Sequence, residues 1–149
     1  PTVKIDGLDT AVFGFSSGSG FYQAAGLSGV EPWGRWSEGH VVKITIPLEE
    51  GVRSLQRVSF RIDPFVPPGS EPLQFDVWIN GNKVDSREVA RAGELRLDYR
   101  LKEEAAKLEA EFRVHNPRSP KSLGMSSDAR RIGLGFKKMV VGTSAEVPN

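Results

Sequence analysis

The chain has 149 residues, of which 20 are Lys or Arg and 19 are Asp or Glu, so its formal net charge is +1. This length predicts a single domain over residues 1–149, with a tail from about residue 142. The balanced charge argues against a nucleic-acid partner, and the absence of cysteine excludes disulfides, thiolate zinc sites and a cysteine nucleophile. No apolar run approaches the ~20 residues of a membrane-spanning helix, so we expect no direct insertion into a membrane.

Short β-rich runs recur between glycines and prolines along the chain, which is typical of a β-sandwich or barrel. In chain order, we predict strands over residues 2–6, 11–15, 41–48, 58–62, 73–79, 83–89, 95–101, 108–114 and 132–141. The stretch 102–110 is rich in helix formers and has room for about two helical turns at most. Residues 116–128 form a long polar loop. These elements predict an all-β fold, a two-sheet antiparallel β-sandwich with at most one short helix.

The clearest local signal is an Asn-Gly pair between residues 73–79 and 83–89. Asn80 and Gly81 supply the positive φ angles that a type I′ hairpin turn requires. Period-two alternation in the preceding strand places Trp78 on the face opposite the core. The pattern therefore predicts an aromatic side chain on the solvent face, unless a second layer covers it.

Catalytic chemistry has little support in the sequence. The two histidines, His40 and His115, are far apart and lack the spacing of a metal site. His40 fits a solvated turn, whereas His115, at the end of a predicted strand, is either a site residue or a cap. Glycoside cleavage would require two carboxylates facing each other across a groove. We therefore predict no catalytic residue, metal ligand or cofactor, and leave open a structural Ca²⁺, whose ligands leave weak sequence traces.

The most unusual segment, residues 26–37, holds two of the three tryptophans. Arg35 lies between Trp33 and Trp36, and Glu31 is close by. Tryptophan faces stack on the C–H faces of sugar rings, while arginine and carboxylate groups bind hydroxyls, so this cluster fits a carbohydrate site. In the alternative interpretation, a tryptophan fills space between the sheets and Arg35 is buried against an acid. Trp33, between a proline and a glycine, is the better candidate for an exposed platform.

A second unusual segment, residues 116–135, concentrates positive charge. Seven basic and two acidic residues between Glu111 and Lys138 give a local charge of +5. This predicts a face that accepts an anion such as phosphate. Alternatively, these are solvated loop charges, with Asp128 paired to Arg35 or Arg130 to hold the final strand.

Together the two segments resemble a known family. The motifs are Gly-Leu-Ser at 26–28, Trp-Gly-Arg-Trp-Ser at 33–37, Asn-Pro-x-Ser-Pro at 116–120 and Leu-Gly-x-Ser-x-Asp-x-Arg-x-Ile-Gly at 123–133. They resemble the β-rich C-terminal accessory domain of bacterial phosphoglycerol transferases that act on periplasmic glucans, and related modules in surface-polysaccharide glycosyltransferases. The likeness covers about residues 12–141. Nothing in the chain matches the catalytic domain of those proteins, so their activity is not carried over.

The resemblance implies a jelly-roll-like, non-catalytic module that assists a cell-envelope glycan enzyme. Its partners would be a glycan or oligosaccharide and a parent catalytic domain outside this chain. Glucan-modifying relatives imply an extracytoplasmic, periplasmic location, and modules of glycosyltransferases a cytoplasmic one. The predicted ligand-binding residues take His115 from its place at the end of a strand and the others from the two motif clusters: Glu31, Trp33, Arg35, Trp36, His115, Asn116, Asp128 and Arg130.

The sequence leaves three functional hypotheses open. The leading hypothesis is a carbohydrate-binding accessory module, for which an exposed tryptophan in a groove would be evidence. The alternative is a structural domain that packs on a parent enzyme and binds no sugar, for which exposed apolar patches would be evidence. The third hypothesis, a small glycan-active enzyme, requires the facing carboxylates described above.

Overall fold

The computed structural model describes residues 10–16, 22–47, 55–105 and 107–142, and within these ranges every regular element is a strand. The strands are β1 (Thr10–Gly14), β2 (Gln23–Ala25), β3 (Arg35–Glu38), β4 (Val41–Pro47), β5 (Leu55–Pro64), β6 (Leu73–Ile79), β7 (Asn82–Val89), β8 (Leu95–Ala105), β9 (Lys107–Val114) and β10 (Ile132–Gly142). No helix in these ranges has the length and apolar character needed to cross a membrane.

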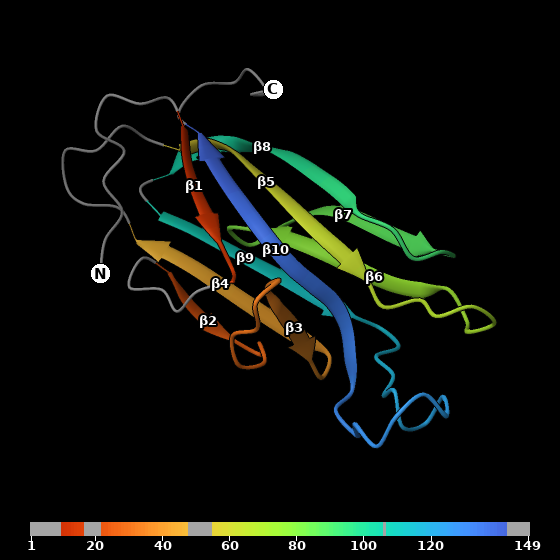
Figure 1. Cartoon of the computed structure of the whole chain (residues 1–149). Helices are drawn as coiled ribbons and strands as arrows, with labels where there is room; N and C mark the ends of the chain where they lie inside the picture. The colour runs from red at the N-terminus through yellow and green to blue at the C-terminus, as the bar shows by residue number, and fades with distance from the viewer. Residues whose placement is uncertain (1–9, 17–21, 48–54, 106, 143–149) are drawn as a thin grey trace.

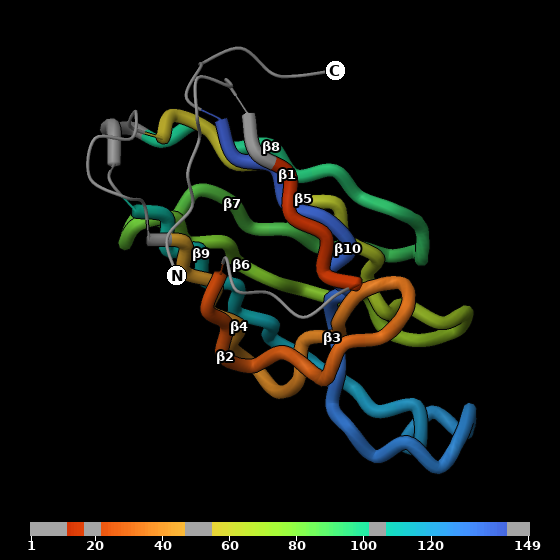
Figure 2. Tube along the Cα trace, turned by 60° about the vertical axis from the view of Figure 1, so that its left-hand side comes forward, coloured from red at the N-terminus to blue at the C-terminus, as the bar shows by residue number. Residues whose placement is uncertain are grey.

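Two antiparallel sheets pack face to face, which confirms the predicted all-β sandwich. The first sheet has the order β1-β10-β5-β8, with β3 also paired to β10, and the second has the order β2-β4-β9-β6-β7. In Figure 1, β10 of the first sheet crosses in front of β9 of the second, and the tube in Figure 2 shows the two layers from another side. The strands β7 and β8 are therefore edge strands of different sheets.

The core is built from the apolar face of each alternating strand. Phe60, Phe112 and Phe136, from β5, β9 and β10, are fully buried and meet edge to face. Their ring centroids are separated by 5.0 to 6.4 Å, within the favourable range for aromatic pairs. These three rings join the two sheets, because Phe112 belongs to the second sheet and the others to the first.

Several predicted elements are confirmed by the structure. The hairpin of β6 and β7 turns at Asn80 and Gly81, whose φ angles are +47° and +82°, as a type I′ turn requires. The stretch 102–110, for which the sequence allowed at most one short helix, is strand over its described residues, because β8 continues to Ala105 and β9 begins at Lys107. Pairing of β8 to β5 and of β9 to β4 outweighs helix propensity there, as the chain passes from one sheet to the other.

The predicted strand 2–6 and the tail beyond residue 142 lie outside the described residues.

The strands β2 and β3 were not predicted from the sequence. They are short, and β3 lies in the segment that was interpreted as a ligand-binding cluster. Its geometry depends on a close backbone approach at Gly34, which has a φ angle of +149°. A Cβ atom at Gly34 would lie 2.1 Å from the carbonyl oxygen of Phe136 in β10. Only glycine allows this contact.

We expect Gly34→Ala to lower the free energy of unfolding by more than about 2 kcal/mol, since it combines a strained φ angle with a steric clash. The matched control is Gly39→Ala, where φ is +79° but no atom lies within 4 Å of the added methyl group. This control should cost about 1 kcal/mol, because only the conformational penalty applies. Urea denaturation of the two variants measures the difference. Equal losses would contradict the close approach.

Candidate functional site

Residues 26–38 form a small hairpin that joins the first two sequence motifs. The backbone N–H of Ser28 donates to the carbonyl of Trp36 at 2.8 Å, and the N–H of Trp36 donates to the Ser28 hydroxyl at 2.9 Å. At the tip, Glu31 and Gly34 exchange both backbone hydrogen bonds. The Gly-Leu-Ser and Trp-Gly-Arg-Trp-Ser motifs are therefore the two arms of one structural unit.

Ser37 fastens this hairpin to an irregularity in β10. The register between β10 and β3 shifts between Ile132 and Gly135. The hydroxyl of Ser37, which is fully buried, accepts hydrogen bonds from the backbone N–H groups of Gly133 at 3.2 Å and Leu134 at 2.8 Å. Ser37 therefore has a bracing role, because it satisfies two buried donors that the shifted ladder leaves open.

Trp33, Trp36 and Phe65 form a row on the outer face of the first sheet, which we call the aromatic platform. The ring centroids are 4.8 Å apart for Trp33 and Trp36, and 5.7 Å apart for Trp36 and Phe65. All three side chains are half-buried. Both indoles lie over Gly135 of β10, where a Cβ atom would come within 3.0 Å of each ring. Trp33 is thus one member of a packed row and not an isolated exposed ring.

Charged side chains lie beside the aromatic platform. Asp63 is the β5 partner of Gly135, and its carboxylate lies 3.6 Å from the amine of Lys137. The same amine donates to Glu94 at 2.9 Å, and Arg61 lies 3.5 Å from Glu94. The neighbouring polar groups thus come from β5, from β10 and from the connection that precedes β8. The sequence pattern did not point to these residues, and its one signal near them is the strand-ending Pro64, which lies between Asp63 and Phe65.

The pair of carboxylates next to the platform is unsuited to glycoside cleavage. Asp63 and Glu94 share one ammonium group and do not face each other across an open groove. The hydrogen bond from Lys137 lowers the pKa of Glu94 below its usual range. The general acid of a glycosidase requires a raised pKa, whereas Lys137 lowers the pKa of Glu94. The arrangement instead offers charged groups that can hydrogen-bond to hydroxyls.

Arg35 braces the hairpin from the other side. Its Nε donates to the carbonyl of Ser28 at 2.7 Å, and its Nη1 donates to the hydroxyl of Tyr22 at 3.2 Å. These partners replace the acidic partner that one interpretation of the sequence assigned to Arg35. Glu31 lies at the hairpin tip, where its Oε2 is shielded from solvent without a hydrogen-bond partner among the described residues.

The second motif cluster lies at the same end of the sandwich. The backbone N–H of Gly39 donates to the carbonyl of Arg131 at 2.8 Å, which ties the β3–β4 turn to the chain just before β10. Arg130 and Asp128 form a multiply hydrogen-bonded ion pair, with a shortest distance of 2.8 Å. The hydrogen bonds from Arg130 lower the pKa of Asp128 to about 2. Glu31 adds to the negative charge around Arg130. The structure thus pairs Asp128 with Arg130, and Glu31 and Glu38 act on Arg130 electrostatically.

Asn116 and its neighbour Arg118 tie loops together. The Asn116 side chain accepts from the N–H of Gln74 at 2.9 Å and donates to the carbonyl of Pro72 at 2.8 Å. Arg118 donates to the carbonyl of Asn116 at 3.0 Å and to the hydroxyl of Ser70 at 3.3 Å. These contacts explain the Asn-Pro motif as a clamp between the β5–β6 and β9–β10 loops.

His115 lies apart from the platform, next to the second sheet. Its Nε2 is 2.8 Å from the carboxylate of Asp76 in β6. Ser86 also donates to Asp76, at 2.7 Å, so serine and histidine both contact the acid. A nucleophilic triad instead requires the serine to contact the histidine.

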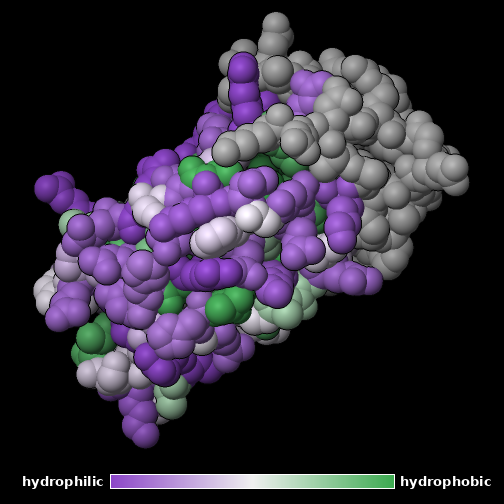
Figure 3. Space-filling view, turned by 180° about the vertical axis from the view of Figure 1, so that it is seen from behind, coloured by the Kyte–Doolittle hydropathy of each residue, from purple (hydrophilic) through white to green (hydrophobic). Residues whose placement is uncertain are grey.

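Trp78 lies on the outer face of the second sheet, as predicted, but it is half-buried and one side of its ring is covered. The guanidinium of Arg113 stacks 4.5 Å from the ring centroid, and the indole Nε1 is shielded from solvent. Seen from behind, this side of the molecule is mostly hydrophilic, with small separate apolar areas (Figure 3). The aromatic platform on the first sheet is therefore the better candidate for stacking. Within the described residues, no group of three His, Asp or Glu side chains could hold a metal ion.

A family model with the description "Domain of unknown function (DUF7024)" matches residues 16–143. The chain belongs to this family. A search of curated protein sequences found no match.

Solved structures share the fold of this family member at low sequence identity. An acetyl xylan esterase (Est2A) from Butyrivibrio proteoclasticus matches with a TM-score of 0.60, 14% identity, and coverage of 94% of this chain and 34% of the esterase. A family two carbohydrate esterase from Cellvibrio japonicus matches with a TM-score of 0.52, 12% identity, and coverage of 93% and 35%. The chain thus spans about a third of each esterase.

A third structure is similar over its whole length. The CBM36-1 domain of a multidomain xylanase from the hindgut metagenome of Trinervitermes trinervoides matches with a TM-score of 0.50, 10% identity, and coverage of 93% of this chain and 99% of the domain. The chain therefore has the size and fold of a module that occurs in a larger carbohydrate-active protein.

We expect Ser37→Ala to reduce the free energy of unfolding by about 1–3 kcal/mol, because two buried N–H groups lose their acceptor. Ser122→Ala is the control, since the Ser122 hydroxyl is exposed and donates only to Ser119. It should change stability by less than about 0.5 kcal/mol. Chemical denaturation of both variants checks this, and equal small effects would exclude a bracing role for Ser37.

The Asp128–Arg130 pair predicts a measurable titration. The pKa of Asp128 is about 2, below its ordinary value of 3.8, so the pair contributes stability above about pH 4 and loses it as the pH falls toward 2. Arg130→Gln should return the pKa of Asp128 toward the ordinary value, whereas Arg113→Gln should leave it unchanged. NMR titration of side-chain carboxyl signals checks both. An ordinary Asp128 pKa in the unsubstituted chain would contradict the ion pair.

Proposed function

We propose that this chain is a non-catalytic carbohydrate-binding module, with the aromatic platform as its ligand surface. The observation that carries the proposal is the half-buried row of Trp33, Trp36 and Phe65, with charged side chains beside it. Half-buried rings combine a fixed orientation with exposed π-surface, which suits stacking on the C–H faces of sugars. Asp63, Glu94 and Lys137 supply hydrogen-bonding groups for hydroxyls. The CBM36-1 likeness supports a fold that suits this role.

The surrounding motif residues divide into two groups under this proposal. Arg35 and Asn116 act on the protein itself, since their side chains hold backbone groups of the hairpin and of the loops. Glu31 lies at the hairpin tip, Asp128 and Arg130 lie in the β9–β10 loop, and the three offer charged groups at this end of the sandwich. His115 and Asp76 belong to a different surface and are proposed only as secondary contacts.

The motif resemblance supports a more specific context. We propose that the module assists a bacterial cell-envelope glycan enzyme of the phosphoglycerol transferase or glycosyltransferase type, with the catalytic domain outside this chain and an extracytoplasmic, periplasmic location. An open sheet face buries little ligand surface, so affinity for a single glycan should be modest. Tethering to the parent enzyme and repeated sugar units would compensate. A structural Ca²⁺ remains a proposal.

A second candidate function has its own observation. Leu123 and Met125, in the β9–β10 loop, are 39% and 56% exposed. Exposed apolar side chains at the loop end favour a structural domain that packs on its parent enzyme without binding sugar. The same binding experiment separates this candidate from the first.

Trp33→Ala should abolish saturable binding of a periplasmic-type β-glucan or of one bacterial surface oligosaccharide from a panel, measured by isothermal titration calorimetry. The loss of one stacked indole removes roughly 1–3 kcal/mol, which is about 5- to 150-fold in affinity and takes a modest affinity below the measurable range. The control is Trp78→Ala, which removes a half-buried tryptophan from the other sheet and should bind as the unsubstituted chain does.

Thermal melting decides between the two candidate functions. Binding that Trp33→Ala loses while its melting temperature stays close to that of Trp78→Ala supports the carbohydrate site. No binding across the panel, together with a drop of several degrees in Trp33→Ala, would overturn it and favour the structural domain.

A further inference from the structure

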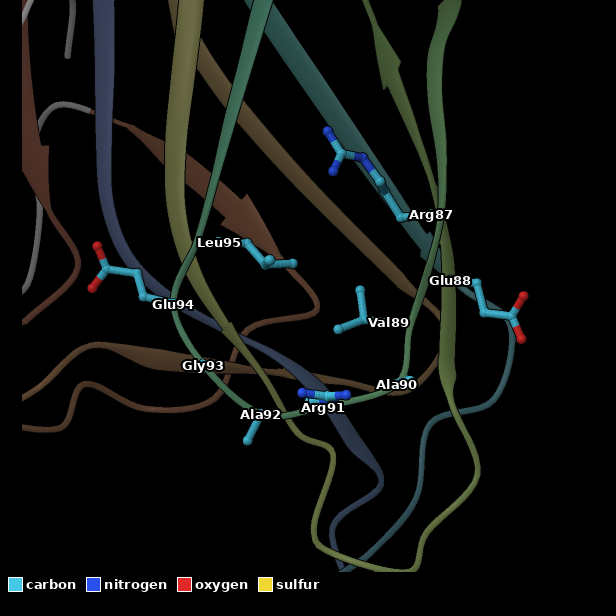
Figure 4. Close-up of a pocket in the computed structure, with 9 residues that line it drawn as sticks. All are labelled: Arg87, Glu88, Val89, Ala90, Arg91, Ala92, Gly93, Glu94 and Leu95. Atoms are coloured by element: carbon cyan, nitrogen blue, oxygen red, sulfur yellow. The ribbon is translucent and has the colours of Figure 1, made fainter.

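One edge of the sandwich is open and forms a groove. The strands β7 and β8 are the edges of different sheets, and residues 90–94 connect them. The connection forms a U around a cavity of about 400 Å³ lined by residues 87–95 (Figure 4). We call this cavity the edge groove. Its volume falls within the range of roughly 300–1,000 Å³ for small-molecule sites.

Apolar and cationic side chains of the edge groove point inward, and its acidic side chains point outward. Val89 and Leu95 point into the U from opposite arms, and Arg87 also points inward, whereas Glu88 and Glu94 point away (Figure 4). Glu94 is held on the outer face of the first sheet by Lys137. The groove therefore has an apolar floor and an inward cation, while its acids lie outside.

Arg87 is held in place by a network that spans the two sheets. Its Nε donates to Oδ2 of Asp85 at 2.8 Å, and the Tyr99 hydroxyl from β8 donates to the same oxygen at 2.7 Å. Burial raises the pKa of Tyr99, so the phenol stays protonated and remains a donor. Asp85 is thus fixed from both edge strands, and it fixes Arg87 in turn.

The geometry of Arg87 leaves donors for a ligand. Only Nε is used by Asp85, and the described residues offer the guanidinium no second acceptor. The terminal amino groups can therefore donate two parallel hydrogen bonds to a planar or tetrahedral oxyanion. Because Asp85 already orients the guanidinium of Arg87, the Arg87 side chain loses less conformational entropy when a ligand binds.

We propose that the edge groove binds a sugar that carries an anionic group. Arg87 takes the carboxylate or phosphate oxygens, and Val89 and Leu95 contact the apolar face of the ring. Arg91 lies on the turn and adds a second cation. This inference deepens the proposed carbohydrate-binding function and rests on it, but it concerns a separate site from the aromatic platform.

The test uses the full chain and compares an acidic and a neutral trisaccharide of the same linkage, together with two smaller anions. The probes are a β-1,4-linked glucuronate trisaccharide, the neutral glucose trisaccharide of the same linkage, glucose 1-phosphate, and acetate. The glucuronate trisaccharide should bind at least about tenfold more tightly than the neutral one, because charge-assisted hydrogen bonds are added. Comparison of glucose 1-phosphate with the glucuronate trisaccharide shows whether the groove prefers a phosphate or a carboxylate.

Arg87→Gln should remove this preference without changing the binding of neutral saccharides. Arg113→Gln is the matched control, since Arg113 also pairs with an acid two residues earlier on its strand and is similarly exposed, at 50% against 43%. It should retain the preference. NMR shifts of amides 87–95 on addition of the acidic trisaccharide locate the site.

Any one of three outcomes would overturn the inference that the edge groove binds an anionic sugar. They are equal affinity for acidic and neutral saccharides, equal losses in the two arginine variants, or acetate that binds the groove as tightly as the trisaccharide. Neutral-glycan binding that Trp33→Ala abolishes, combined with any of these results, leaves the proposed function intact. If neutral glycans do not bind, the aromatic platform fails, while an acid preference that depends on Arg87 still supports the edge groove.

Discussion

The close approach of the 26–38 hairpin to β10 is the constraint on which the candidate site depends. Gly34 lets the hairpin backbone touch β10 at the carbonyl of Phe136, and Gly135 leaves the space above β10 that both indoles occupy. Ser37 satisfies the N–H groups that the irregular register exposes. A larger side chain at either glycine would push the hairpin away, and the aromatic platform would lose its support.

This constraint explains why stacking residues and bracing residues alternate along one short segment. In β3, Ser37 is buried and holds β10, while Trp36 is half-buried and joins the platform. A strand presents successive side chains on opposite faces, so one segment can serve both the interior and the surface.

The platform lies on the first sheet and the edge groove lies between the edge strands of the two sheets, but Glu94 belongs to both. This residue lies on the turn that forms the groove, yet its carboxylate turns outward to Lys137 beside the platform. The Lys137 contact thus removes an acid from the groove and adds one next to the aromatic row.

The sequence by itself determined the fold class, most strand positions and the type I′ turn at Asn80 and Gly81, because alternation and turn chemistry are local properties. It also singled out Trp33 and Trp36 by composition. Only the tertiary structure decided that Arg35 and Asn116 hold backbone groups, that Phe65 completes the platform, and that Arg87 points into a groove. Those facts depend on which strands become neighbours, and register between distant strands is fixed by packing of the whole sandwich.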